Sequence, residues 1–178
     1  PTDLAKAEEA IEQAELILMQ LEIPMDTVEF VAKTAWKKNK RVILNPAPAQ
    51  TLSATLLRHL YMITPNETEA EMISGVKITD EVSAEKAARV IMEMGVQNVI
   101  ITLGSKGALI YCDSMVDMVP AIKVEAVDTT AAGDIFNGAL TVALREAVRF
   151  ACKASAISVT RVGAQSSAPY RNEVDIFD

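Results

Sequence analysis

The sequence predicts an α/β fold, with a doubly wound, mostly parallel sheet flanked by helices. Short apolar runs alternate along the chain with segments whose apolar residues recur at helical spacing, which is the pattern of repeated βα units. The runs are apolar at consecutive positions, as in 42–44, which is typical of strands buried on both faces of a parallel sheet. Ligands of such folds bind at the carboxyl ends of the strands.

The expected elements follow one another in order. We predict helices over 3–14, 25–38, 52–60, 67–74 and 83–94, with strands over 16–21, 41–45, 61–64 and 98–103. Strand 98–103 is joined to a further strand over 108–112 by the glycine-bounded turn 104–107. The alternation over 121–127 predicts a strand, and the last third of the chain is mostly helical.

Composition narrows the class of protein. The chain has 178 residues, half of them hydrophobic, and a net charge of −7 with a pI near 4.8. Its length suits one domain, and its acidity argues against a nucleic-acid partner, since phosphate backbones demand clustered cations. No apolar run approaches the roughly twenty residues of a membrane helix, and two distant cysteines indicate neither disulfides nor zinc. We therefore expect a cytoplasmic protein without a membrane partner.

The stretch 128–134, Asp-Thr-Thr-Ala-Ala-Gly-Asp, carries the clearest chemical signal. It precedes an apolar helix, so the first amides of that helix point into a loop of tiny residues and favour a bound anion. Asp134, on the first turn, is placed to accept a proton from an attacking hydroxyl. This arrangement suits phosphoryl transfer to an alcohol. The alternative is structural, with Asp128 or Thr130 as the helix cap and Asp134 complementing the helix dipole.

This stretch resembles the signature of the ribokinase family of sugar and nucleoside kinases. The resemblance implies that Asp134 is the catalytic base and that Ala131, Ala132 and Gly133 form the anion hole. Asn66 and Glu69 match a second family motif, Asn-x-x-Glu, which implies phosphate binding by Asn66 and a hydrated Mg²⁺ held by Glu69. From spacing alone, the same pair is a helix capping box, and both roles are compatible.

Two further segments resemble the family's binding loops. The span 102–107 is similar to its nucleotide loop, which implies ATP contacts from Thr102, Gly104, Ser105, Lys106 and Gly107. We also expect Cys152 to contact the nucleotide. By itself the span is a hairpin turn with a solvated lysine. The span 158–169 is similar to the family's monovalent-cation loop, although a helix C-cap with Gly163 in the αL conformation would also explain it. The implied K⁺ ligands are Asp128, Thr130, Ser158, Arg161 through its carbonyl, Gly163 and Ser167.

The resemblance also implies a substrate. Glu22 follows a strand within Leu-Glu-x-Pro, a family segment that implies hydrogen bonds to sugar hydroxyls, although a strand-end glutamate is usually only solvated. The expected reaction is ATP-dependent phosphorylation of D-ribose at the 5-hydroxyl to ribose 5-phosphate. Another sugar or nucleoside kinase of the family and a non-catalytic nucleotide-binding fragment remain alternatives.

The chain also departs from the family pattern. We expect residues 1–178 to be its nucleotide-binding and catalytic portion, and the amino-terminal sugar-binding and lid portion to be absent. In the full-length protein the resemblance implies a homodimer. The family also separates two helices where this chain continues through Leu144 and Arg145 without glycine or proline, so we expect that residues have been lost there.

Overall fold

The computed structural model describes residues 2–140 and 144–177, and the chain divides into two compact units. The first unit comprises 1–102 with 109–117, and the second comprises 103–108 with 118–178. The sheet contains β1 (Leu16–Met19), β2 (Arg41–Leu44), β3 (Met62–Ile63), β4 (Asn98–Thr102), β5 (Ala108–Cys112) and β6 (Met115–Val119). The first unit also holds α1 (Thr2–Gln13), α2 (Met25–Lys37), α3 (Ala54–Arg58), α4 (Glu67–Ser74) and α5 (Glu81–Glu93).

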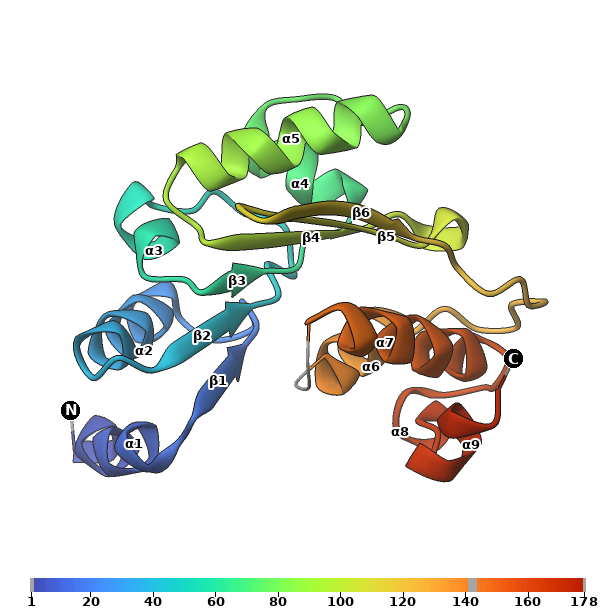
Figure 1. The fold of residues 1–178 in the computed structure, drawn as a ribbon. Coiled ribbons are helices and arrows are strands. Elements are labelled where there is room, and N and C mark those ends of the chain that lie inside the picture. Colours follow the sequence, from blue (N-terminus) through green and yellow to red (C-terminus); the bar gives the residue numbers. More distant parts are fainter. Residues whose placement is uncertain (1, 141–143, 178) are drawn as a thin grey trace. The chain divides into compact units, whose positions relative to one another are not determined.

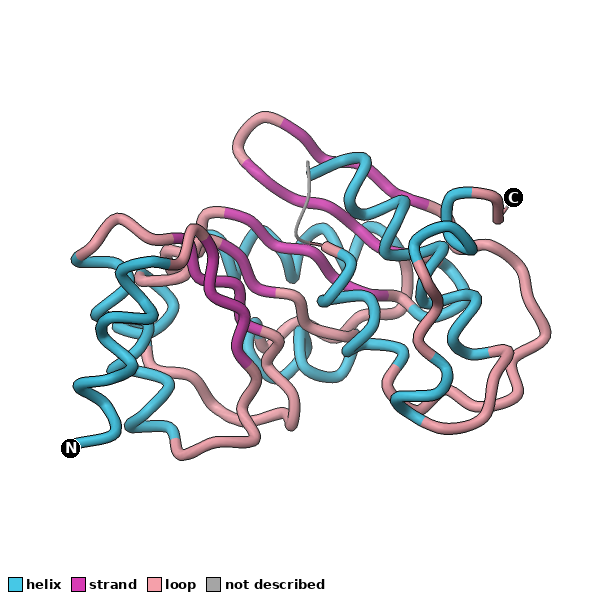
Figure 2. The backbone as a smooth tube through the Cα atoms, turned by 90° about the horizontal axis from the view of Figure 1, so that it is seen from below, coloured by secondary structure: helices cyan, strands magenta, loops and turns pink. Residues whose placement is uncertain are grey.

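The strands lie side by side in the order β1-β2-β3-β4-β5-β6, and the first four are parallel (Figure 2). The register pairs Ile17 with Val42, Ile43 with Met62, and Ile63 with Val99. Because crossovers between parallel strands are right-handed, a sequential strand order places their helices on one face of the sheet. Figure 1 shows α2 to α5 there. The predicted α/β class, with a mostly parallel sheet flanked by helices, is confirmed.

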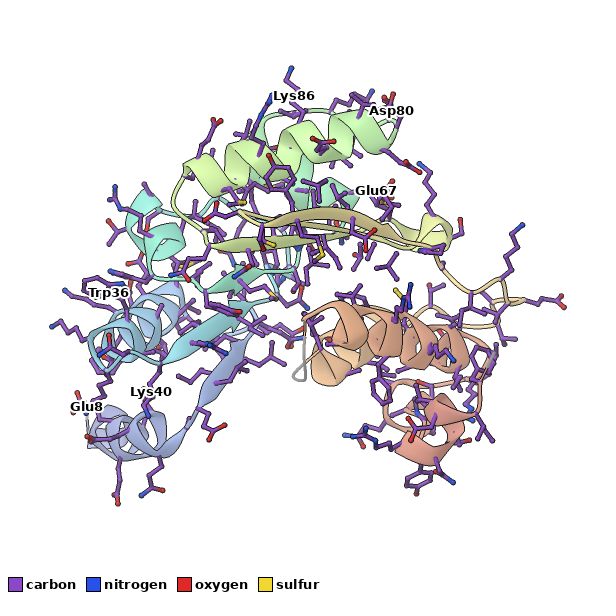
Figure 3. The ribbon with its side chains drawn as sticks, viewed as in Figure 1. Glu8, Trp36, Lys40, Glu67, Asp80 and Lys86 are labelled. Carbon is purple, nitrogen blue, oxygen red and sulfur yellow. The ribbon has the colours of Figure 1, made fainter. Side chains whose placement is uncertain are left out.

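Burial follows the expected pattern. Val42, Ile43 and Leu44 are consecutive in β2 and all buried, as a strand covered on both faces requires. Helix α5 buries one stripe, formed by Ala84, Ala87, Ala88 and Ile91, while Lys86 points away from the sheet (Figure 3). The apolar strands and amphipathic helices therefore form the core of the first unit.

The second unit consists of the turn η1 (Gly104–Lys106) and the helices α6 (Ala132–Ala139), α7 (Leu144–Val159), α8 (Ala164–Ser167) and α9 (Arg171–Asp175). Helices α6 and α9 both pack against α7. Ala154 and Ile157 of α7 and Val174 of α9 form a small buried core there. This packing brings α6 and α7 together.

The prediction of a strand over 121–127 is wrong, and the actual strand, β6, precedes it. A strand needs a neighbouring strand to satisfy its backbone groups, and these residues pair elsewhere. The N–H groups of Val127 and Asp128 both donate to the carbonyl of Val159, at 2.6 and 3.0 Å. Val127 is 64% exposed, so the apolar alternation does not mark a buried face. The segment before α6 is therefore a loop anchored on the end of α7.

The carboxyl third is helical, as predicted, and α6 and α7 are separate helices. Residues 141–143 lie outside the described residues, and the expected loss of residues at Leu144 and Arg145 falls at their edge, so it stays a prediction. No helix within the described ranges is long and apolar enough to cross a membrane.

Candidate active site

The start of α6 is an uncapped helix N-terminus. Its N-cap is Ala131, which has φ 61° and ψ 9° and no side-chain hydrogen bond, so neither Asp128 nor Thr130 caps the helix. The Ala132 N–H donates to the Thr129 carbonyl at 3.3 Å, while helix geometry leaves the Gly133 amide without a partner one turn back. Gly133 is exposed, and a Cβ placed on it would meet nothing within 4 Å. An anion has room to approach these amides.

Asp134 is the third residue of α6 and lies exposed on the same first turn. Its carboxylate is thus held by the helix next to the amides of the predicted anion hole. A non-glycine residue at positive φ, as at Ala131, is strained and persists where the surrounding structure holds it. The local backbone suits stabilisation of negative charge beside the Asp134 carboxylate.

Asp128 links two loops of the second unit instead of capping α6. Its Oδ1 accepts a hydrogen bond from the Thr130 N–H at 2.9 Å, and its Oδ2 accepts one from the Gly163 N–H at 3.1 Å. The hydroxyl and N–H of Thr130, together with the Gly163 N–H, hold the pKa of the Asp128 carboxyl below its usual range. The carboxylate is therefore ionised at neutral pH, and it joins the loop before α6 to the loop after α7.

The loop after α7 gathers oxygen atoms. The hydroxyls of Ser158 and Ser167 lie 3.1 Å apart, and both residues are almost fully buried. The carbonyl of Ser158 accepts from the Arg161 N–H at 3.0 Å, and the Arg161 guanidinium pairs with Glu173. The guanidinium of Arg161 is thus engaged in an ion pair, and its carbonyl as a cation ligand stays a prediction. Donors of this all-oxygen kind suit a hard cation such as K⁺.

Gly163 does not adopt the αL conformation that a C-cap predicts. Its φ of 93° and ψ of 158° place it in a region reserved for glycine, and it precedes α8, a short helix that the sequence did not reveal. A Cβ there would lie 2.6 Å from the Ser166 hydroxyl oxygen. Glycine suits this position because other residues rarely adopt such a φ, and in this conformation its N–H donates to Asp128. Within the described ranges, no group of three or more His, Cys, Asp or Glu side chains is arranged to hold a metal ion.

Asn66 and Glu69 of the first unit form the predicted capping box at the start of α4. The Asn66 side chain accepts from the Glu69 N–H at 2.9 Å, and the Glu69 carboxylate accepts from the Asn66 N–H at 2.8 Å. Burial raises the pKa of the Glu69 carboxyl, and the hydrogen bonds from Asn66 partly oppose this shift. Thr102 lies beside them, because Asn66 and Thr102 form a parallel bridge at the ends of β3 and β4.

The turn 104–107 has the glycine geometry that its sequence predicts. Gly104 and Gly107 have φ values of 55° and 110°, and the Leu103 N–H donates to the Gly107 carbonyl at 2.8 Å. A Cβ on Gly107 would lie 2.0 Å from the Val119 carbonyl oxygen, so the close backbone approach requires glycine. Ser105 and Lys106 are exposed on the turn. Cys152 lies on α7, where burial raises the pKa of its thiol to about 11.

Glu22 is exposed in the loop after β1, at the carboxyl end of the strand. Its neighbour Leu21 donates its N–H to the Ala47 carbonyl, which joins the loops after β1 and β2. Glu22, Asn66, Glu69 and Thr102 belong to the first unit, at the carboxyl edge of the parallel strands. The remaining candidates, in the turn 104–107, the loop 128–134 and α7 to α8, belong to the second unit.

Comparison with known proteins decides the family. The model of the pfkB family carbohydrate kinases matches residues 1–171. The chain belongs to this family. Among curated pfkB relatives, the chain is 49% identical over 174 residues to a ribokinase of Haemophilus influenzae, with 94% of this chain and 57% of the relative covered. It is 37% identical over 180 residues to a deoxyribokinase of Salmonella typhi, with 95% and 58% covered.

A solved structure also agrees in fold. The structure of Arabidopsis thaliana ribokinase complexed with ribose and ATP superimposes with a TM-score of 0.90 at 30% identity, covering 95% of this chain and 57% of that one. The chain thus spans somewhat more than half the length of these relatives.

The motifs did not reveal three side chains that contact the candidate site residues in the structure. Glu173 pairs with Arg161, Asn137 donates to the Gly133 carbonyl at 2.8 Å, and Ser155 donates to the Ala132 carbonyl at 3.2 Å. Asn137 lies four residues after Gly133, so helical spacing alone points to it. Ser155 and Glu173 are distant in sequence from their partners, and no local pattern indicates them.

Proposed function

We propose that this chain is the nucleotide-binding and catalytic portion of a ribokinase, which transfers the γ-phosphoryl group of ATP to the 5-hydroxyl of D-ribose. The observation that carries the proposal is the first turn of α6, where Asp134 lies beside exposed amides that no side chain caps. The ribokinase relatives of similar sequence support the choice of reaction.

In this reaction Asp134 accepts the proton of the sugar hydroxyl as its oxygen attacks the γ-phosphorus. The new O–P bond forms while the bond to the bridging oxygen of ADP breaks, and ADP leaves with the electron pair. The amides at Ala131 to Gly133 stabilise the charge on the transferring group. Phosphoryl transfer needs little covalent chemistry from the protein, so positioning and electrostatics carry the catalysis.

We assign nucleotide binding to two segments. The exposed residues 104–106 of the turn suit contacts to phosphate and ribose, with Lys106 supplying a positive charge. Buried Gly107 completes the turn against the Val119 carbonyl, and Cys152 is a further contact. Asn66 and Thr102 contribute from the carboxyl edge of the sheet. Glu69 is the carboxylate for a hydrated Mg²⁺, which neutralises phosphate charge when bound. The hydrogen bond from the Asn66 N–H to Oε2 of Glu69 orients the carboxylate and leaves Oε1 to face the metal's hydration shell.

The monovalent cation site belongs to the same proposal. The residues present fit K⁺, since Asp128, Thr130, Ser158, Arg161, Gly163 and Ser167 offer carboxylate, carbonyl and hydroxyl oxygens. The Asp128 carboxylate links this loop to the segment that leads into α6. These residues would hold K⁺, which would supply positive charge to the site when bound, and the chain's own hydrogen bonds keep the two loops together.

Glu22 is the sugar-binding residue that this chain contributes. We further propose a cytoplasmic location, which the low cysteine content supports. We also propose that the full-length protein is a homodimer, which the family resemblance supports. A second candidate activity is phosphorylation of deoxyribose, which the similarity to a deoxyribokinase favours. A nucleotide-binding portion without catalysis is the remaining alternative.

A coupled ADP-release assay on the complete protein tests the proposal against ribose, 2-deoxyribose, fructose and a nucleoside. We expect turnover with ribose, and a fall of kcat by about 10²–10⁴-fold in Asp134→Asn, because general base catalysis typically contributes a factor of that size. Preference for another acceptor would overturn the substrate assignment. Full activity of Asp134→Asn would overturn the role of the base.

A further inference from the structure

Two side chains donate hydrogen bonds to the carbonyl oxygens of the first turn of α6. The amide nitrogen of Asn137, from the next turn, donates to the Gly133 carbonyl at 2.8 Å. The Ser155 hydroxyl, from α7, donates to the Ala132 carbonyl at 3.2 Å. In an α-helix these carbonyls already accept the backbone N–H groups four residues later. The additional bonds are therefore not needed to complete the helix.

The position of each carbonyl determines which amide it affects. The Ala132 carbonyl belongs to the same planar peptide group as the Gly133 N–H, and the Gly133 carbonyl to the same group as the Asp134 N–H. A hydrogen bond accepted by the carbonyl withdraws electron density and strengthens the N–H as a donor. Ser155 thus acts on the Gly133 amide, and Asn137 acts on the Asp134 amide.

The surroundings favour fixed geometry at both positions. Asn137 is only 3% exposed, and Ser155 is half-buried between the packed helices α6 and α7. Ala131, immediately before this turn, has the positive φ of a strained residue that its environment must hold. The hydrogen bonds to the carbonyls of Ala132 and Gly133 hold the two peptide groups that follow Ala131 in a fixed orientation.

We propose that Asn137 and Ser155 are positioning residues that orient and polarise the Gly133 and Asp134 amides toward the transferring phosphoryl group. This inference rests on the proposed function and deepens it, since it names the side chains that prepare the Gly133 amide of the anion hole and adds the neighbouring Asp134 amide to it. Neither side chain touches substrate in this scheme. Both act through the backbone.

The test uses three variants of the complete protein. Ser155→Ala deletes the hydroxyl, and Ser155→Thr keeps a hydroxyl at the same position. Asn137→Asp replaces the NH₂ donor with an acceptor of the same shape. Ser74→Ala is the matched control, because the Ser74 hydroxyl also donates to a helix carbonyl, that of Ala70, at 2.6 Å in α4. The measurements are kcat, KM for ATP, thermal midpoint, and the affinities for ADP alone and for ADP with aluminium fluoride.

We expect Ser155→Ala and Asn137→Asp each to lower kcat by about tenfold, less than the 10²–10³ lost with a direct oxyanion donor. The affinity for ADP with aluminium fluoride is expected to fall by the same factor, because this complex mimics the transition state. The KM for ATP and the affinity for ADP alone stay within about twofold, since these amides act on charge that develops in the transition state. Ser155→Thr restores kcat, and Ser74→Ala leaves it unchanged.

A purely structural role predicts something else. If Ser155→Ala lowers the thermal midpoint as Ser74→Ala does and leaves kcat unchanged, the inference is wrong, while the loss of activity in Asp134→Asn still supports the proposed function. If the wild-type protein shows no kinase activity, both fail together. Ser155→Ala is a small change at a half-buried site, so it decides the question even if Asn137→Asp does not fold.

Discussion

The carboxylate of Asp128 accepts a hydrogen bond from the backbone N–H of Gly163 at 3.1 Å, although the two residues are 35 positions apart. The same carboxylate accepts from the Thr130 N–H at 2.9 Å. The loop that leads into α6 is thereby joined to the loop that follows α7. The geometry of the first turn of α6 depends on a contact that only the folded chain provides.

Asp128→Asn is expected to loosen this junction. An asparagine oxygen replaces one of the two acceptors, while its NH₂ group faces an N–H donor and repels it. We expect a lower thermal midpoint for the second unit and a kcat reduced by about tenfold to a hundredfold, as small displacements of a catalytic group cause. Glu125→Gln, an exposed carboxylate of the same loop, serves as the control and is expected to change neither. Equal effects of the two variants would contradict the assignment.

Gly133→Ala and Gly138→Ala form a matched pair within α6. A Cβ at either position meets nothing within 4 Å, so each variant is expected to fold and to gain about 0.5–1 kcal/mol from the better helix former. Only Gly133 lies at the proposed anion hole, where a methyl group crowds the approaching phosphoryl oxygens. Chemical denaturation and steady-state kinetics should show a stability gain in both variants and a loss of kcat in Gly133→Ala alone. Parallel kinetics in the two would exclude an anion at Gly133.

Glu69→Gln separates metal binding from folding. Folding raises the pKa of the Glu69 carboxyl. Its contribution to the free energy of unfolding is therefore present below the unfolded pKa, near 4.3, and is lost as pH rises through the folded-state pKa. Glutamine keeps an oxygen to accept the Asn66 N–H and carries no charge to desolvate.

The variant is therefore expected to have a thermal midpoint equal to or above that of the wild type at pH 7.5, while more Mg²⁺ is needed for half-maximal activity. Thermal scans and Mg²⁺ titrations provide the measurement, with Glu85→Gln on the exposed side of α5 as the control. An unchanged Mg²⁺ requirement would remove Glu69 from the metal site.

Acid is expected to weaken the second unit. The Arg161 guanidinium beside Glu173, with the Tyr170 N–H, holds the pKa of the Glu173 carboxyl below its usual range. A depressed folded-state pKa contributes stability above the unfolded pKa, near 4.3, and that stability disappears as pH falls through the folded value.

Thermal midpoints measured from pH 7 to pH 3 should therefore drop below about pH 4, the range set by the unfolded pKa. Glu173→Gln should reduce this drop and lower the midpoint at pH 7. Asp175→Asn removes the exposed pair with Arg171 and should have little effect at pH 7, because surface ion pairs contribute little. A pH profile unaltered by Glu173→Gln would refute the linkage.

The nucleotide turn offers a second matched pair. Gly107→Ala places a Cβ 2.0 Å from the Val119 carbonyl oxygen, whereas the same change at Gly104 meets nothing within 4 Å. Gly104→Ala is therefore expected to cost only the left-handed backbone penalty, about 1–2 kcal/mol. Gly107→Ala should cost more and weaken ATP binding through distortion of the turn. Calorimetric titration with ATP checks both, and equal affinities would place ATP away from this turn.

Much of the fold follows from local patterns. The helix from Glu67 to Ser74 and its capping box were predictable, because the Asn66 and Glu69 partners lie three residues apart and local spacing determines their contact. The strand predicted at 121–127 failed for the opposite reason. Alternation of apolar residues is a local property of the sequence, whereas a strand forms only where another strand supplies hydrogen-bond partners. Here the N–H groups of Val127 and Asp128 donate instead to the carbonyl of Val159 at the end of a helix.

The candidate site divides in the same way. The sequence by itself determined the residue types, from the glycine turn 104–107 to the two carboxylates around 128–134, and their place at the starts and ends of elements. Tertiary structure alone decided that Asp128 binds Gly163 and that Ser155 reaches the Ala132 carbonyl. Side chains separated by many residues meet only when helices pack, since the energy that brings them together comes from burial of apolar surface elsewhere in the chain.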